Sequence, residues 1–403
     1  MLPMLRIEAG VLIAFAFVLP LYEAPKNLLW LAFVVLWLVN RWRARDFGGR
    51  WDRWDTLIAL WIGSAYASAA FAGMHHDEWR AAADVLRYAG VLWLLKRSRY
   101  PERTWMLVAL AIIAGTVAGL VGGYVVVART HDSLILNSVG HVNHSAIYLA
   151  IVFGLALAAT LAWWSTSGMA LRLFAAALLV ALIVSLVWME SRGAFGAALI
   201  VAVALLGARG ARQRRHLGAT SLILVLAVGA ALLLKPEVIE KNAHFMQKGE
   251  LLNYREGAWR VGISAWREFP LFGVGMDGFG RIRADHLQAW SAKRGEPFDR
   301  QSFLFTSHGH SLYITTLAER GLVGLGVLLA VLVAWAASLL RGFPGAGASP
   351  LRWTYWGGTA SAWMITIVVG VVNTTLHHEH ALLCMLLLGG WLSLNGASRQ
   401  TPS

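Results

Sequence analysis

Twelve runs of apolar residues, most of them long enough to cross a bilayer, constrain this chain more than any other feature. A membrane-spanning helix needs about 20 mostly apolar residues. In lipid, a helix also satisfies its own backbone hydrogen bonds. The runs predict spans over residues 8–22, 27–40, 56–74, 81–95, 105–128, 145–164, 169–189, 194–208, 217–235, 311–340, 353–372 and 379–396.

The composition excludes a soluble protein. Hydrophobic residues make up 58% of the 403 residues and charged residues only 14%, whereas soluble domains carry roughly 25% charged residues. The single cysteine, Cys384, excludes a scaffold of intrachain disulfides. We therefore expect an all-α integral membrane protein with about 12 transmembrane helices, the first of which is a permanent span and not a cleaved signal peptide.

The positions of the basic residues predict how the spans are oriented in the membrane. They collect after even-numbered spans: Arg41, Arg43, Arg45, Arg50 and Arg53; Lys96, Arg97, Arg99 and Arg103; Arg209, Arg212, Arg214 and Arg215; Arg341 and Arg352. By the positive-inside rule, both termini are cytoplasmic and the odd-numbered connections face outward. The net charge of +13 is then mostly topological and favours contact with anionic membrane lipids, not with nucleic acid.

One outward connection is far longer than the others. Residues 236–310 carry ten Lys/Arg and nine Asp/Glu, and loops of this length inside a compact protein are usually functional. Apolar spacing predicts a helix over Leu251–Phe269 that ends at Pro270. The expected organisation is thus residues 1–235 with nine spans, a loop domain over 236–310 that contains the active-site segments, and residues 311–403 with three spans and a cytoplasmic C-terminus.

Arginines and glycines mark the outward face. Arg192 lies in a short turn, Glu190-Ser191-Arg192-Gly193-Ala194, where it either snorkels to the interface or binds an anion. Arg255 and Arg260 lie in the predicted loop helix, which otherwise resembles a solvated amphipathic helix. Gly273 and Gly275 belong to a stretch with four glycines in eight residues, which could bring backbone amides close to a ligand.

Histidines mark the same face. His308 and His310 precede the tenth span in Ser307-His308-Gly309-His310-Ser311; such a histidine is often structural, but it can also take a proton from a hydroxyl near neutral pH. His377, His378, Glu379 and His380 form a metal-like cluster, for which packing at the interface is the preferred interpretation. We find no GxxxxGK[ST], HExxH or CxxC pattern, so we expect no metal site and no cofactor, and activity that survives EDTA.

The order and side of these motifs resemble the O-antigen ligase and polymerase superfamily of bacterial inner membranes. The resemblance rests on Ser191-Arg192-Gly193-Ala194, then Arg255 and Trp259 in the loop, then Pro270–Phe279 as P-L-F-G-V-G-x-x-x-F, then His310-Ser311 and Ala318–Gly324 as A-E-R-G-L-V-G. It covers about 190–325, and the closest likeness is to the O-antigen ligases. Family members commonly have H-N where this chain has His310-Ser311.

The resemblance implies a GT-C-like, metal-independent, inverting glycosyltransferase with its active site facing the periplasm of a Gram-negative bacterium. It would transfer O-antigen from undecaprenyl diphosphate to a sugar hydroxyl of lipid A–core. Arg192 and Arg255 would hold the diphosphate, with Arg260 in reserve, because guanidinium groups pair phosphate oxygens and keep their charge. His310, with His308 as the alternative, would be the general base. Gly273, Gly275 and Ser311 are the further expected substrate contacts.

Two other functions stay open. An O-antigen polymerase, or another superfamily member, would perform the same chemistry on a lipid-linked glycan as acceptor. A transporter or flippase would place its ionisable residues near the bilayer midplane and often shows repeated halves; neither feature is evident in the sequence.

The predicted topology can be tested by cysteine labelling from outside intact cells. We expect Arg192, the 236–310 loop and His310 to be periplasmic, and Arg45, Arg97 and Arg214 to be cytoplasmic. A cysteine at position 280 should therefore be labelled, and one at position 97 should be protected. Labelling at 97 but not at 280 would overturn this orientation.

Overall fold

The computed structural model describes residues 3–75, 78–210, 214–234, 255–345 and 347–398. Every regular element in this part of the chain is a helix. The helices that match the predicted spans are α1 (Pro3–Val18), α2 (Glu23–Ala44), α3 (Arg53–Phe71), α4 (Glu78–Lys96), α5 (Glu102–Thr130), α6 (Val142–Trp163), α7 (Met169–Trp188), α8 (Arg192–Gly210), α9 (Arg214–Leu234), α13 (Leu312–Arg341), α14 (Pro350–Val372) and α15 (His378–Ser398). Each predicted span thus falls on a helix, with bounds that agree to within a few residues.

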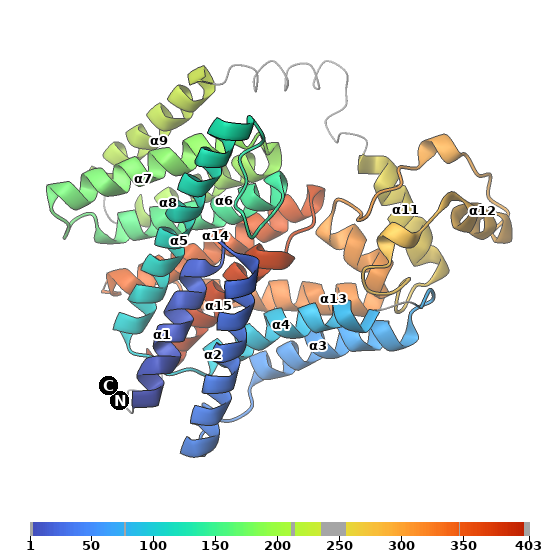
Figure 1. Ribbon diagram of the computed structural model, residues 1–403, viewed down its shortest axis with the longest axis horizontal. Coiled ribbons are helices and arrows are strands. Elements are labelled where there is room, and N and C mark those ends of the chain that lie inside the picture. Colours follow the sequence, from blue (N-terminus) through green and yellow to red (C-terminus); the bar gives the residue numbers. More distant parts are fainter. Residues whose placement is uncertain (1–2, 76–77, 211–213, 235–254, 346, 399–403) are drawn as a thin grey trace.

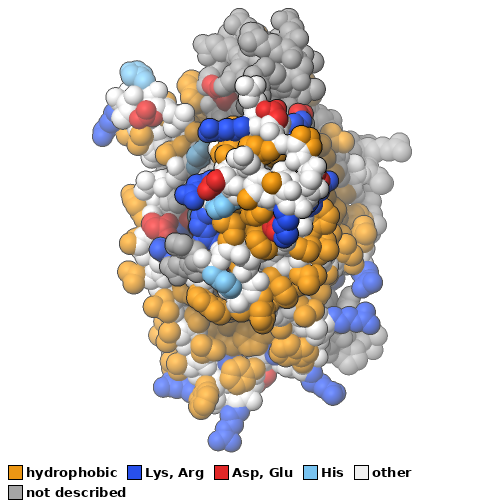
Figure 2. All heavy atoms as spheres, turned by 90° about the vertical axis from the view of Figure 1, so that its right-hand side faces the viewer, with side chains coloured by type: hydrophobic (Ala, Val, Ile, Leu, Met, Phe, Trp, Pro, Cys, Tyr) orange, Lys and Arg blue, Asp and Glu red, His pale blue; other side chains and the backbone are white. Residues whose placement is uncertain are grey.

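Six of these helices are long and apolar enough to cross a membrane, namely α5, α6, α7, α8, α13 and α14. The all-α membrane class is therefore confirmed. The exact number of twelve spans stays a prediction, because the remaining helices are shorter, less apolar or more charged. Large apolar side chains such as Leu28, Phe174 and Val333 are exposed on the described surface, as expected where a surface faces lipid. Figure 2 shows apolar side chains over broad areas of one face, with Lys and Arg along its lower edge.

Helix α6 lies at the centre of the bundle. Its most apolar stretch is 94% buried, whereas that of α7 is 33% buried. A helix that is apolar all round is expected to be buried on all sides. Helices α14, α8, α7 and α15 pack against it. In Figure 1, α1 and α2 lie below it, α7 and α9 form the left-hand end, and α11 and α12 form the right-hand end.

The basic end of α4 is tied to the start of α3. Asp52 caps α3 by accepting hydrogen bonds from the backbone of Trp54 and Asp55, while Asp55 accepts one from the backbone of Asp52 at 2.8 Å. Asp55 also pairs with Lys96 at 2.8 Å and with Arg97 at 2.9 Å. Because Arg97 is buried in this cluster, the exposed Arg45 is the better labelling position on this side.

The long connection contains more structure than its sequence predicted. Helix α11 (Arg255–Glu268) ends where the prediction places it, and residues 251–254 lie outside the described residues. A second helix, α12 (Ala284–Lys293), and two short 3₁₀ turns, η1 (Phe279–Arg281) and η2 (Arg300–Ser302), were not predicted. Val261, Phe279 and Leu287 form a small apolar core of this loop domain against Ala318 of α13.

Helix α13 is broken at Gly321, and the glycine-rich segment fills the break. Gly321 has φ +60° and ψ −161° inside the helix. In an unbroken helix the backbone N–H groups of Leu322 and Val323 would bond the carbonyls four residues earlier. Here Leu322 N donates to Pro270 O at 2.8 Å, and Val323 N donates to Leu271 O at 3.2 Å.

The carbonyls freed by the break find partners in the same segment. The oxygen of Ala318 accepts from Val274 N at 2.9 Å, and that of Glu319 accepts from Gly275 N at 3.1 Å. The loop therefore replaces the missing helical hydrogen bonds one for one, which matters because unpaired backbone groups are costly in an apolar surrounding. The two sequence motifs, 270–275 and 318–324, are thus two halves of one joint.

This joint predicts a specific pattern of glycine sensitivity. A Cβ at Gly321 would lie 2.3 Å from the backbone of Leu271, and one at Gly273 would lie 2.4 Å from the backbone of Glu319; both glycines also have positive φ. We expect Gly321→Ala and Gly273→Ala each to destabilise the protein by roughly 2–4 kcal/mol. Thermal unfolding in detergent is the measurement.

Gly326→Ala is the matched control, because Gly326 lies in the same helix with nothing within 4 Å of its Cβ position. This variant should be neutral or slightly more stable, since alanine favours helix. Equal melting temperatures for all three variants would show that the joint is not tightly packed.

Candidate active site at the mouth of α13

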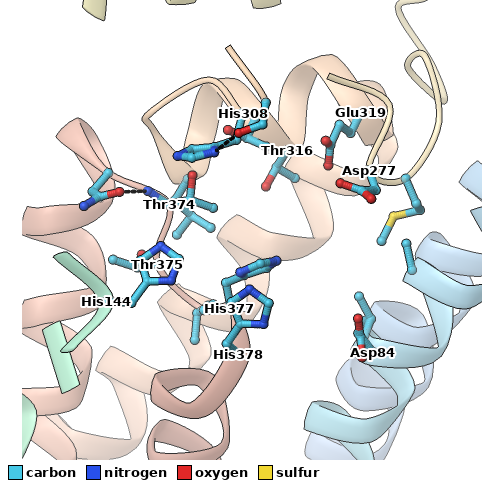
Figure 3. A pocket seen from close by; sticks show the side chains of 18 of the residues that line it. Asp84, His144, Asp277, His308, Thr316, Glu319, Thr374, Thr375, His377 and His378 are labelled. Atoms are coloured by element: carbon cyan, nitrogen blue, oxygen red, sulfur yellow. Dashed lines mark hydrogen bonds between the residues drawn. The ribbon is translucent and has the colours of Figure 1, made fainter. Parts of the chain in front are cut away.

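A cavity of about 800 Å³ opens where the loop domain meets the bundle. Its walls come from α4, the connection before α6, the loop around 276–281, the start of α13 and the α14–α15 connection (Figure 3). Most of these segments belong to connections predicted to face outward. The structure brings them together around one cavity. The volume lies within the range of ligand pockets, roughly 300–1,000 Å³.

His310 lies at the rim of this cavity, immediately before the helix. Its backbone has φ +46°, an uncommon conformation for a residue with a side chain. The rings of His308 and His310 lie 4.4 Å apart between centroids, and both side chains line the cavity. Thr315 Oγ1 accepts a hydrogen bond from Gly309 N at 3.1 Å and so ties the turn between the two histidines to the first turn of α13.

The arginines predicted from sequence approach His310 from two other elements. Arg192 begins α8 and Arg255 begins α11. Burial lowers the pKa of Arg255, and the positive charge of Arg192 lowers it further. Burial lowers the pKa of His310 to about 4, and the charges of His308 and then Arg255 contribute to this shift. The charge of Arg192 therefore acts on Arg255, and that of Arg255 acts on His310.

His308 differs from His310 in this respect. Its pKa is lowered by burial and then by His141, and its Nδ1 lies 3.0 Å from Ser307 Oγ. Arg255 is among the causes of the shift at His310 and not among those at His308. The charge of Arg255 thus acts on His310, and the choice of His310 over His308 as the base stays a prediction.

Arg192, Arg255 and Arg260 are not among the residues that line the large cavity, whereas Arg80, Arg281 and Arg320 are. His310 lines the cavity, and Arg260 is exposed on α11. A second cavity of about 470 Å³ is lined by Met189 and Glu190, just before Arg192, and shares Asn143 with the first. His310 therefore belongs to the cavity wall, and its pKa also responds to the charge of Arg255.

Gly273, Gly275 and Ser311 use their polar groups within the protein. The amide of Gly273 donates to Phe269 O at 3.1 Å, and that of Gly275 serves the joint with α13. Ser311 is buried and caps α13, accepting from Ile314 N at 3.4 Å and donating to Gly370 O at 3.2 Å. These residues shape the site through the backbone, and their contact with substrate stays a prediction.

The sequence reasoning missed the acidic residues of the cavity. Asp84 projects from α4, and the side chains of Asp277 and Glu319 lie close to each other on one side of the cavity (Figure 3). Glu319 also accepts a hydrogen bond from Phe279 N at 3.3 Å. Asp84 lies inside a predicted span, and an ionisable residue at such a position is a known signal of function that could have identified it.

Salt bridges hold the cavity walls together. Arg281 in the loop pairs with Glu78 of α4 at 2.9 Å. Glu379, which the sequence grouped with the neighbouring histidines, is buried and pairs instead with Lys26 of α2. Glu379 therefore has a structural partner and is not available to a ligand in the cavity.

The fold and the site define a multi-pass helical membrane protein with an ionisable site at one end of the bundle. Residues 176–329 match the family described as O-antigen ligase. This match supports membership of the O-antigen ligase and polymerase superfamily, as the motifs predicted, and indicates a glycosyl-transferring enzyme of polysaccharide assembly. The matched segment includes Arg192, Arg255 and His310. A search of curated proteins found no match.

Proposed function

We propose that this protein is an O-antigen ligase that transfers polysaccharide from undecaprenyl diphosphate to a sugar hydroxyl of lipid A–core at the periplasmic face of a Gram-negative inner membrane. One observation carries the proposal. His310 lines a cavity that also contains carboxylates, hydroxyls and arginines, and it lies with Arg192 and Arg255 in the segment that matches the O-antigen ligase family.

The positive charges of Arg192 and Arg255 suit the diphosphate of the donor. A diphosphate leaving group gains negative charge as its bond to the sugar breaks, so fixed positive charge stabilises the transition state more than the ground state. Arg192 and Arg255 would supply that charge through hydrogen bonds to phosphate oxygens. Arg260 is exposed on α11, and we therefore assign it the lesser role.

The large cavity suits a sugar acceptor. Asp84, Asp277, Thr316 and Thr374 line it, and carboxylates and hydroxyls can hydrogen-bond sugar hydroxyl groups. An acceptor bound there would present its hydroxyl oxygen towards His310, with the donor held by the arginines beyond.

Transfer would then be a single displacement. The acceptor oxygen forms a bond to the anomeric carbon while the bond from that carbon to the diphosphate oxygen breaks, and its electron pair stays on the diphosphate. His310 takes the hydroxyl proton through its neutral imidazole. Attack from the face opposite the leaving group inverts the anomeric centre. No step in this scheme requires a metal ion.

Product analysis separates the ligase from the polymerase. Purified protein would receive undecaprenyl-diphosphate-linked glycan with lipid A–core and, in a parallel reaction, a lipid-linked glycan as the sole acceptor. Glycan on lipid A–core supports the ligase. Longer lipid-linked glycan with no modified lipid A–core would show a polymerase instead.

Substitutions should separate the roles of the charged residues. Arg192→Lys and Arg255→Lys keep the charge but lose the bidentate geometry, so turnover should fall severely. His310→Ala should retain donor binding and lower turnover by roughly 10²–10⁴, the usual range for a general base. Donor binding and glycan transfer are measured for each variant.

Two variants serve as controls. His308→Ala should have a milder effect, because the pKa shift of His308 has no contribution from Arg255. Arg267→Ala should retain near-normal transfer, since Arg267 is exposed and pairs with Glu296 on the surface of the loop domain. Full activity of His310→Ala together with loss in His308→Ala would identify the other histidine as the base.

The pH profile offers an independent check. A general base is active when neutral, and the lowered pKa of His310, about 4, keeps it neutral throughout the range above pH 5. We therefore expect kcat/KM, which reports the free enzyme, to show no acid limb from this group between pH 5.5 and 8. An acid limb near 6.5, the ordinary pKa of histidine, that disappears in His310→Ala would contradict the assigned environment.

A further inference from the structure

Three histidines from three parts of the chain converge on one wall of the large cavity. His144 lies in the first turn of α6, His377 in the α14–α15 connection and His378 at the start of α15. One side-chain nitrogen of each lies within 4.8 Å of those of the other two. Figure 3 shows the three imidazoles together, on the side of the cavity away from Asp277 and Glu319.

The nearby Glu379 and His380 do not line the cavity, although Nδ1 of His380 is buried without a hydrogen-bond partner among the described residues. Glu379 is paired with Lys26. His141 Nδ1 accepts a hydrogen bond from Asn143 N at 3.1 Å. His380 Nε2 accepts one from His377 N at 3.3 Å, so His380 positions the backbone of His377. Among the described residues, His144, His377 and His378 are the group of three possible ligands whose nitrogens lie close together and whose side chains all line the cavity.

One nitrogen of this trio lacks a protein partner among the described residues. Nδ1 of His377 is buried and has no hydrogen-bond partner among the described residues. A buried polar atom of this kind costs stability unless something binds it. Packing at the membrane interface, the interpretation preferred from sequence for His377 and His378, leaves that nitrogen unsatisfied.

We propose that His144, His377 and His378 form a binding site for one transition-metal ion of the Zn²⁺ class, with its fourth position open to the cavity. Imidazole nitrogen selects Zn²⁺, Cu²⁺ or Ni²⁺ over Mg²⁺ and Ca²⁺, which prefer oxygen. Three histidines with an open position are a known zinc ligand set, and zinc–nitrogen distances near 2.0–2.1 Å place ligand nitrogens about 3.4 Å apart. Small side-chain rotations from 4.8 Å reach that spacing.

The metal site is separate from the transfer machinery. None of its ligands is Arg192, Arg255 or His310, and the displacement proposed above needs no cation. A bound ion would cross-link α6 to the α14–α15 connection and so brace one wall of the cavity. The site thus goes beyond the proposed function, and either can fail without the other.

Zinc binding by the purified full-length protein, without a histidine tag, tests the site. After treatment with EDTA and removal of the chelator, Zn²⁺ is titrated by calorimetry, and melting temperature is recorded with and without Zn²⁺. We expect one ion per chain and a higher melting temperature with Zn²⁺, because a ligand that binds the native state stabilises it. Mg²⁺ should produce neither effect.

Variants locate the ion. His144→Ala and His378→Ala should each weaken Zn²⁺ binding by more than about tenfold and abolish the rise in melting temperature. The exposed His378 is the less disruptive position, and melting without zinc checks that both variants fold. His75→Ala is the matched control, since His75 is exposed and lies outside the trio.

Each outcome bears on the site directly. Unaltered Zn²⁺ binding in both trio variants, an equal response to Mg²⁺, or the absence of bound Zn²⁺ would overturn it. Glycan transfer by the EDTA-treated protein is assayed in parallel, and we expect it to persist. A transfer reaction that instead requires Zn²⁺ and fails in His378→Ala would support the metal site while overturning the metal-independent mechanism.

Discussion

The exchange of backbone hydrogen bonds at Gly321 is the interaction on which the site depends. A helix in an apolar surrounding cannot break without new partners for the backbone groups it exposes. The segment 270–275 supplies those partners to Ala318, Glu319, Leu322 and Val323. Because the loop domain is held in this way, Asp277 and Glu319 lie close to each other on one side of the cavity, and the apolar core of the loop packs on Ala318.

Buried polar contacts also hold the walls of the cavity in place. Each wall is held by its own contacts: Arg281 with Glu78, Lys26 with Glu379, and the buried Arg320, which donates to Trp61 O at 3.3 Å and to Ser64 Oγ. These buried contacts hold the backbone of distant segments in place.

Sequence patterns anticipated the helices well and the loop domain in part. Hydropathy located every helix of the bundle because an apolar run of membrane length leaves the backbone few alternatives. The end of α11 followed from Pro270. Helix α12 was missed, since its ten residues carry little apolar periodicity and owe their stability to Leu287 in the small core. The grouping of Arg192, Arg255 and His310 was anticipated only through the family resemblance.

By itself, the sequence determined the fold class, the helix positions and the kinds of chemistry available, because hydropathy and residue type are local properties. Only the tertiary structure decided which side chains meet. His144 lies beside His377 and His378, which are more than 230 residues away in the sequence. Glu379 forms an ion pair with Lys26 instead of lying with these histidines in the cavity. Asp84, which lies in a predicted span, lines the cavity. The tertiary structure also assigned Gly273 and Gly275 to the joint with α13. These pairings depend on how helices pack against one another, and no periodicity within a single helix encodes them.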